Sequence, residues 1–362
     1  MDASQKEGMS IRREATTASR AKAPLIGAQL STAGGFASVP ERAVAIGAEV
    51  AQVFNTNPRM WRARIPALTE IEALIAGLRT HRLRLFFHSI YLINLASADD
   101  ELRQRSLEAL ALALASGAAA GAEAVVTHIG SHRGEAVDRA AHRIVQSITA
   151  AFSLARDLAG AQTAAADRGP ERLARELPRL LLETAAGAGN TVGGRLEDLA
   201  NLLSLHDAGH TAGPGAGNPD HLPAGAQADA DVRPPALGIC IDTAHLFAAG
   251  YAVHEETGLE ELIAELRELK LLDRTGLVHL NDSRTAFASR HDYHENLGEG
   301  LIGYEALSRV VRHPALTQVP FVLEVPGAEG HGPDAANMAL AKRMRSGAAR
   351  PARRQRPAPK RL

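Results

Sequence analysis

The sequence predicts an α/β protein, a single (β/α)₈ TIM-type barrel flanked by disordered basic tails. The chain has 362 residues, 45% of them hydrophobic. That is enough for a barrel, which needs about 250 residues. Eight short apolar runs recur along the chain, and segments with apolar residues three and four positions apart lie between them. This alternation of strand and helix predicts a parallel sheet that closes on itself.

The eight predicted strands are short and rich in apolar residues: LIGAQ (25–29), EVAQVF (49–54), LRLFFH (83–88), AVVTH (124–128), RLLLE (179–183), LGICID (237–242), GLVHL (276–280) and PFVLE (320–324). Helical spacing is clearest in TEIEALIAGLRTH (69–81), DELRQRSLEALALALASGAAAG (100–121) and HEETGLEELIAELRELKLLD (254–273). Each helix therefore carries the chain from the end of one strand back to the start of the next.

Two stretches, 157–177 and 206–236, interrupt this alternation with Gly, Pro, Ala and Asp, and they predict flexible loops. Each precedes a strand, so we expect both at the N-terminal face of the barrel, away from the chemistry. The second stretch holds His206, His210 and His221. These histidines are either a metal cluster or solvated loop residues, and the composition favours the second reading.

Charge is unevenly distributed along the chain. Residues 342–362 hold nine Lys or Arg and no acid, and residues 1–22 carry a net +2. Since the whole chain carries −1, residues 23–341 carry −12. We therefore expect a disordered N-terminal tail (1–22), a barrel domain (23–341) and a disordered basic C-terminal tail (342–362). Bound divalent cations would offset part of the acidic charge of the barrel.

The lone Cys240 excludes an intramolecular disulfide and a thiolate zinc cluster, which favours a reducing, cytoplasmic location. No uninterrupted apolar run is long enough for a membrane span, and no apolar stretch follows the basic residues near the N-terminus. The sequence thus predicts neither a membrane segment nor a secretory signal.

Six of the eight predicted strands carry a histidine or a carboxylate at their C-terminal end: His88, His128, Glu183, Asp242, His279 and Glu324. Barrel active sites lie at this edge. Any one of these residues alone is more simply a satisfied polar group at a strand end. Six at one edge predict a metal centre. Imidazole and carboxylate donors without thiolate suit zinc or manganese, and this many ligands imply more than one ion.

Three further candidates lie just beyond the strands. His245 follows Asp242 by three residues, at the start of a predicted helix. Asp292 and His294 are two residues apart in a loop, so in an extended segment their side chains point the same way and can bind one ion. Without the strand-end residues, a solvated loop would be the simpler reading of this pair.

Seven segments carry a resemblance to a known family: IGAQLSTAGG (26–35), FNTNPRMWRA (54–63), FHSIYLINLAS (87–97), THIGSH (127–132), LLETAAGAGNTVG (181–193), GICIDTAHLFAAGY (238–251) and HLNDSRTAFASRHDYHENLGEGLIG (279–303). The chain resembles endonuclease IV, the metal-dependent apurinic/apyrimidinic endonucleases that adopt a (β/α)₈ barrel. The segments occur in the family's order and cover nearly everything between the tails.

The resemblance implies three Zn²⁺ ions, with Mn²⁺ as an alternative at part of the centre. His88, His128 and Glu183 would bind the first ion. Glu183 would also bind the second, with Asp242, His279 and Glu324. His245, Asp292 and His294 would bind the third.

The resemblance also implies a substrate, duplex DNA that contains abasic sites or blocked 3′ ends. Arg59, Tyr91 and Leu92 match residues that push into the minor groove while the abasic sugar turns out. Hydrolysis 5′ to the lesion would leave a 3′-hydroxyl and a 5′-deoxyribose phosphate. Glu183 and Glu324 would help to take the proton of the attacking water. We expect a DNA repair enzyme that acts as a monomer.

Two departures from the family pattern are Gln29, where members usually carry His, and HIGSH (128–132), where they carry HPGSH. The alternative function is a metal-dependent sugar isomerase or epimerase on the same barrel, which should need fewer metals and no DNA wedge. A second alternative is a DNA-binding protein without catalytic activity.

Overall fold

The structure is a computed structural model that describes residues 23–61, 65–164, 176–211 and 237–351. The expected tail 1–22 lies outside these residues, as do 165–175, most of the second expected loop (212–236), and the last residues, 352–362.

Eight parallel strands form a closed barrel in the order β1-β10-β7-β6-β5-β4-β3-β2. The barrel strands are β1 (Ile26–Leu30), β2 (Val50–Phe54), β3 (Arg84–His88), β4 (Ala124–Thr127), β5 (Arg179–Glu183), β6 (Leu237–Asp242), β7 (Thr275–His279) and β10 (Phe321–Leu323). Their bounds agree with the eight predicted strands to within a residue. The first and last strands pair directly, Ile26 with Phe321, so the predicted fold class is confirmed.

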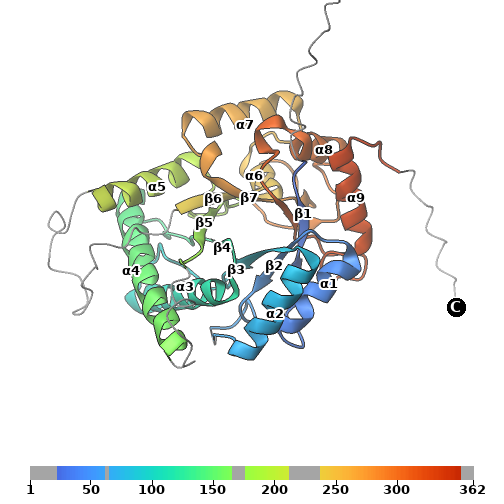
Figure 1. Cartoon of the computed structure of the whole chain (residues 1–362). Helices are drawn as coiled ribbons and strands as arrows, with labels where there is room; N and C mark the ends of the chain where they lie inside the picture. The colour runs from blue at the N-terminus through green and yellow to red at the C-terminus, as the bar shows by residue number, and fades with distance from the viewer. Residues whose placement is uncertain (1–22, 62–64, 165–175, 212–236, 352–362) are drawn as a thin grey trace, which may run out of the picture.

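Helices surround the strands on the outside of the barrel (Figure 1). They are α1 (Val39–Ile46), α2 (Leu68–His81), α3 (Asp100–Ala120), α4 (Val137–Ala164), α5 (Leu196–Thr211), α6 (Thr243–Ala249), α7 (Glu256–Glu268), α8 (Tyr304–Arg312) and α9 (Ala335–Ser346). Three 3₁₀ turns, η1 (Phe36–Ser38), η4 (Leu272–Arg274) and η5 (Pro314–Leu316), and a two-stranded sheet of β8 (Asp282–Ser283) and β9 (His294–Glu295) complete the described part.

Apolar side chains inside the barrel form one buried cluster, which includes Val50, Phe86, Ala124, Val126, Leu181, Cys240, Leu277 and Val322. Because successive residues of a strand point to opposite faces, the residue two positions further along also points inward. That step leads from Phe86 to His88, from Leu181 to Glu183 and from Cys240 to Asp242. A ring of inward polar side chains therefore lies next to the barrel core, toward the C-terminal ends of the strands.

Local sequence signals explain why the helices begin and end where they do. Asp99 caps α3 by accepting hydrogen bonds from the backbone N–H groups of Glu101 and Leu102, at 3.0 and 3.1 Å. The same helix ends at Gly121, whose φ of 71° is the left-handed conformation that glycine adopts readily.

The two predicted loops are shorter than expected. Helix α4 continues to Ala164 and helix α5 to Thr211, so residues 157–164 and 206–211 are helical. His206 is buried, and its ring centroid lies 6.1 Å from that of Phe152. The reading of His206 as a solvated loop residue is therefore wrong, and it packs between α5 and α4. His221 lies outside the described residues.

The expected boundary of the C-terminal tail at residue 342 is also wrong. Helix α9 runs to Ser346 with Met344 fully buried, because Met338, Ala341 and Met344 form one apolar face. Beyond the helix, the Tyr304 hydroxyl donates a 2.6 Å hydrogen bond to the carbonyl oxygen of Ala348. Within the described residues, no helix is both long and apolar enough to span a membrane.

Candidate metal centre

Every barrel strand contributes one inward polar side chain, which lies at or near the C-terminal end of the strand except for Gln52, the middle residue of β2. We call this set the polar ring: Gln29, Gln52, His88, His128, Glu183, Asp242, His279 and Glu324. The six residues predicted from the strand ends are all members. Glutamines come from the two strands for which no ligand was predicted.

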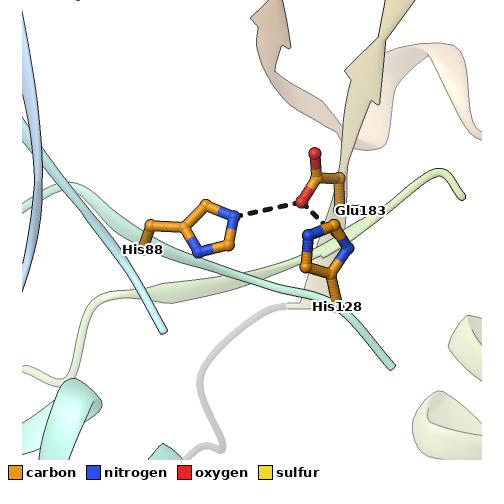
Figure 2. Close-up of side chains that lie close together, drawn as sticks. All are labelled: His88, His128 and Glu183. Atoms are coloured by element: carbon orange, nitrogen blue, oxygen red, sulfur yellow. Dashed lines mark hydrogen bonds and ion pairs between the residues drawn. The ribbon is translucent and has the colours of Figure 1, made fainter. Parts of the chain in front are cut away.

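The first group of the ring is formed by His88, His128 and Glu183 (Figure 2). The Oε2 atom of Glu183 lies 3.1 Å from Nε2 of His88 and 3.3 Å from Nδ1 of His128. On the other side of its ring, Nδ1 of His88 donates to the carbonyl oxygen of Ser89 at 2.7 Å. Since that bond places the proton on Nδ1, the Nε2 atom of His88 is the one that can ligate a cation.

The second group is formed by Glu183, Asp242, His279 and Glu324. Its centre is Nδ1 of His279, which lies 2.9 Å from Oε1 of Glu183 and 3.3 Å from Oε2 of Glu324. Glu183 thus turns one carboxylate oxygen to each of the two groups. A carboxylate shared in this way can bridge two cations.

Asp242 is oriented by the helix that follows it. Its Oδ1 atom caps α6 by accepting from the N–H groups of Ala244 (2.7 Å) and His245 (3.0 Å). Its Oδ2 atom faces the ring and lies 3.8 Å from Nδ1 of His279. The start of α6 therefore fixes the direction in which this ligand candidate points.

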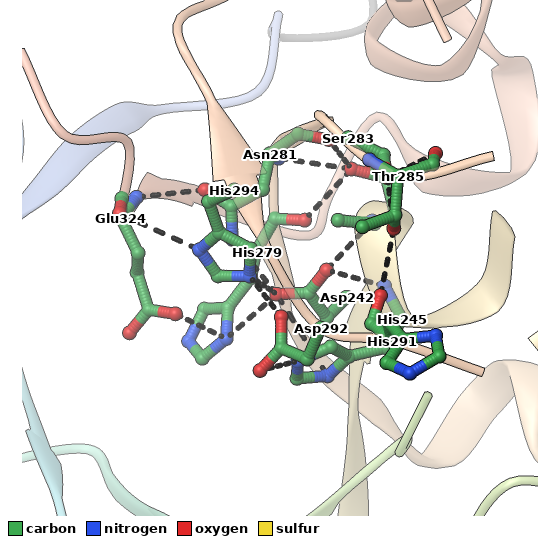
Figure 3. Close-up of polar contacts among 12 residues, drawn as sticks. Asp242, His245, His279, Asn281, Ser283, Thr285, His291, Asp292, His294 and Glu324 are labelled. Carbon is green, nitrogen blue, oxygen red and sulfur yellow. Dashed lines mark hydrogen bonds and ion pairs between the residues drawn. The ribbon is translucent and has the colours of Figure 1, made fainter. Parts of the chain in front are cut away.

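The third group brings the loop residues to the barrel (Figure 3). Nε2 of His245 lies 3.1 Å from Oδ2 of Asp292, and Nε2 of His294 lies 3.2 Å from Oδ1 of the same carboxylate. Asp242 joins the two histidines, with its Oδ2 atom 3.5 Å from Nε2 of His294. The predicted trio is assembled, and Asp242 stands at the border between the second and third groups.

Opposite charges offset burial in this cluster. Burial raises the pKa of Glu183, but the imidazoles of His128 and His279 outweigh it and hold this pKa well below its usual value. Burial lowers the pKa of His245, but Asp242 and Asp292 raise it well above the usual value. The same balance raises the pKa of His294 to about 9. The raised pKa values of His245 and His294 favour protonated imidazoles beside Asp242 and Asp292, and divalent cations would replace those protons.

The donor atoms fit divalent cations of the zinc or manganese kind. They are imidazole nitrogens and carboxylate oxygens, with ligand atoms of each group within 4.8 Å of one another. Three carboxylates meet in the second group, two of them buried (Glu183 and Asp242) and one partly buried (Glu324), and such charges require neutralisation by cations. Glu183, Asp242 and His279 are almost completely buried, at 1%, 0% and 0% exposure.

Several supporting residues were not predicted. Nδ2 of Asn281 donates to Oδ2 of Asp242 at 2.7 Å, and Oδ1 of Asn281 accepts from the N–H of Glu324 at 2.9 Å. Thr184 accepts the backbone N–H of Asp242 at 2.9 Å through its hydroxyl and the Nδ1–H of His245 at 2.8 Å through its carbonyl. The available signal was their position one or two residues after a strand-end ligand, Thr184 after Glu183 and Asn281 after His279.

Asp282 holds the loop that precedes α8. Its buried carboxylate accepts five backbone N–H groups at 2.9 to 3.2 Å, those of Ser283, Gly298, Gly300, Ile302 and Gly303. Strand β8 begins at this residue and pairs with β9, which carries His294. The segment that bears Asp292 and His294 is therefore fixed at both of its ends.

The three residues predicted to contact DNA lie on two adjacent loops. The N–H of Tyr91 donates to the carbonyl oxygen of Pro58 at 2.9 Å, which joins the Tyr91 loop to the Arg59 loop. Tyr91 is 48% exposed as a residue, and its ring lies 5.8 Å from the His88 ring. Arg59 is exposed, whereas Leu92 is partly buried against the barrel core. Tyr91 therefore lies at the edge of the first group, and the loop that carries Arg59 is joined to it through Pro58.

Comparison with known proteins identifies relatives over nearly the whole chain. A family model described as a xylose isomerase-like TIM barrel matches residues 40–213 and 213–346. A probable endonuclease 4 from Nitratidesulfovibrio vulgaris (strain DP4) is 33% identical over 323 residues, 89% of this chain and 99% of the relative. A probable endonuclease 4 from Halothermothrix orenii is 32% identical over 319 residues, 88% of this chain and 99% of the relative.

Solved structures give the same result. The crystal structure of endonuclease IV from Thermus thermophilus matches with a TM-score of 0.68 and 35% identity, over 90% of this chain and 100% of that one. A D-tagatose 3-epimerase-like protein matches with a TM-score of 0.57 but only 14% identity, so this likeness shows the fold alone. Sequence identity, coverage and the assembled ligand groups together place the chain: it belongs to the endonuclease IV family of xylose isomerase-like TIM barrels.

Proposed function

We propose that this protein cuts duplex DNA at the phosphodiester 5′ to an abasic site, leaving a 3′-hydroxyl and a 5′-deoxyribose phosphate. Membership of the family makes it an endonuclease, a hydrolase of DNA repair. The observation that carries the proposal is the assembly of all nine candidate ligands into three adjoining groups, of which the first two share Glu183 and the last two meet at Asp242. The same centre would remove blocked 3′ ends, which also requires hydrolysis of a phosphodiester.

Three Zn²⁺ ions, with Mn²⁺ as an alternative in part, are the proposed cofactors. His88, His128 and Glu183 would hold the first, Glu183, Asp242, His279 and Glu324 the second, and His245, Asp292 and His294 the third. When bound, such ions lower the pKa of water and offset negative charge on the attacking and leaving oxygens. The ions would also reverse the sign of the local field, so that a phosphate could approach four carboxylates.

The protein's own residues would position the substrate and move the proton. Glu183 is buried and ionised, and with Glu324 it would accept the proton of the attacking water. Arg59, Tyr91 and Leu92 would enter the minor groove where the missing base has weakened stacking. The exposed Tyr91 ring beside His88 supports this role, because it stands between solvent and the first ligand group.

The test is incision of a duplex with one abasic analogue by the purified protein, with bound metal measured on the same sample. We expect a single cut 5′ to the lesion, three divalent ions per chain, and no cut in an otherwise identical intact duplex. The protein is expected to act as a monomer in the cytoplasm. A metal-loaded protein that leaves the lesion strand uncut but interconverts free sugars would reject the proposal in favour of an isomerase or epimerase.

A further inference from the structure

Gln52 is fully buried in the polar ring and hydrogen-bonds three of its neighbours. Its Nε2 atom donates to Oε1 of Glu324 and to Oε1 of Gln29, both at 2.8 Å. Its Oε1 atom accepts from Nε2 of His279 at 3.0 Å. One amide thus connects β1 and β2 to two members of the second ligand group, which come from the far end of the chain.

Only one orientation of this amide satisfies all three contacts. Both hydrogens of Nε2 are used, one toward the Glu324 carboxylate and one toward the Gln29 carbonyl. The flipped amide would set its oxygen 2.8 Å from two acceptor oxygens, one of them on a carboxylate. The positions of Glu324 and Gln29 therefore determine which end of Gln52 faces His279.

This orientation determines the proton arrangement of His279. Because the oxygen of Gln52 accepts, Nε2 of His279 carries a hydrogen, and Nδ1 is the nitrogen that can present a lone pair to a cation. Nδ1 points toward Glu183 and Glu324, at 2.9 and 3.3 Å. Gln52 also engages Oε1 of Glu324, which leaves Oε2 of that carboxylate on the side of His279.

We propose that Gln52, oriented by Gln29, is a positioning residue for the second cation position. It selects the ligating nitrogen of His279 and the ligating oxygen of Glu324. This proposal depends on the metal centre of the proposed function, but it does not depend on the DNA reaction. It also gives the departure at Gln29 a role, since the carbonyl oxygen of Gln29 helps to hold the Gln52 amide in place.

The test is the zinc affinity of Gln52→Met. This substitution keeps the length of the side chain and removes its hydrogen bonds to Gln29, Glu324 and His279. Removing a residue that hydrogen-bonds a metal ligand lowers metal affinity by about 10- to 100-fold. We expect a loss of that size for one of the ions in chelator competition, with the others unchanged. Gln29→Met should cause a smaller loss, because the bonds from Gln52 to Glu324 and His279 remain.

The matched control is Gln104→Met on α3, which removes an exposed hydrogen bond to Glu108 and should leave zinc affinity unchanged. Melting temperatures of the metal-free proteins separate positioning from a merely structural role. A lower melting temperature in Gln52→Met with unaltered zinc affinity would overturn the proposal. If Gln52→Met does not fold, Gln29→Met decides: weaker zinc binding at an unchanged metal-free melting temperature supports the proposal, and unchanged binding overturns it.

Incision assayed in parallel keeps this inference apart from the proposed function. A wild-type protein that binds zinc but cuts no abasic duplex rejects the DNA reaction and leaves the zinc comparison valid. A wild-type protein that cuts, together with equal zinc affinity in Gln52→Met, rejects only the role of Gln52.

Discussion

Glu183 is the residue on which the metal centre depends most, because its two oxygens face different ligand groups. An amide in its place has one weak acceptor and no charge, so it cannot serve both groups. We expect Glu183→Gln to lower the incision rate by more than about 100-fold, since even residues that only support a ligand contribute about 10- to 100-fold. The measurement is single-turnover incision, with circular dichroism to establish that the variant is folded.

The matched comparison for this prediction is His294→Ala, which removes a proposed ligand of the third ion alone and should lose one ion of three. A folded Glu183→Gln protein with its full metal content and the wild-type rate would show that the carboxylate does not bridge. An unchanged ion count in His294→Ala would remove His294 from the ligands.

Arg59 and Tyr91 are predicted to act only at the damaged position of a DNA duplex. The double variant Arg59→Ala with Tyr91→Ala should keep its metals, since neither side chain belongs to a ligand group. It should bind abasic duplex about 10-fold or more weakly while binding to intact duplex changes little, because unstacking costs least at a damaged base. The measurement is the dissociation constant for both duplexes at one salt concentration. Equal losses of affinity for abasic and intact duplex would mean that Arg59 and Tyr91 contact only the DNA backbone and do not recognise the lesion.

At the scale of elements, Glu49 joins the last helix to the start of the barrel. Its carboxylate accepts from Arg345 on α9 at 2.6 and 3.1 Å and from the N–H of Ile26 at 2.9 Å. Burial would raise the pKa of Glu49, but these bonds and the charges of Arg345 and Lys342 hold it below the usual 4.5. The stabilisation is therefore complete above that value and is lost as pH falls through the lowered pKa.

We accordingly expect Glu49→Gln to lower the free energy of unfolding by about 1–2 kcal/mol at neutral pH. The difference from the wild type should shrink as the pH falls below 4.5. Thermal or urea melts at neutral and acidic pH measure it. A constant difference across that range would mean that the ionised carboxylate is not the source of the stability.

The elements also show what the sequence could predict. Strand ends were predictable because a barrel strand alternates, so an inward ligand follows an inward apolar residue by two positions. Gln52 obeys the same rule, but an amide in an apolar strand carries no chemical signal until its partners are known. The end of α9 was missed because Lys342, Arg343 and Arg345 conceal the apolar spacing that buries Met344. His206 was misread because its neighbours Ala208 and Gly209 suggested a loop.

At the scale of the whole molecule, the charge distribution predicts a salt-dependent contribution from the C-terminus. Residues 352–362 hold five of the nine basic residues and none of the proposed ligands. Deleting them should weaken binding to intact DNA and flatten the plot of log affinity against log salt by about 0.9 for each lost phosphate contact. Turnover at saturating substrate and low salt should stay close to the wild type. Identical salt slopes would mean that this segment serves only solubility.

The carboxylate of Asp282 has a consequence for the dynamics of the loop that it holds. The N–H groups of Gly298, Gly300, Ile302 and Gly303 lie outside any strand, yet one buried acceptor binds all four. Their exchange with deuterated solvent should then be slow, at rates typical of a sheet and not of a surface turn. Since the four share one partner, they should open together as a single cooperative unit, and Asp282→Asn should release them as a set.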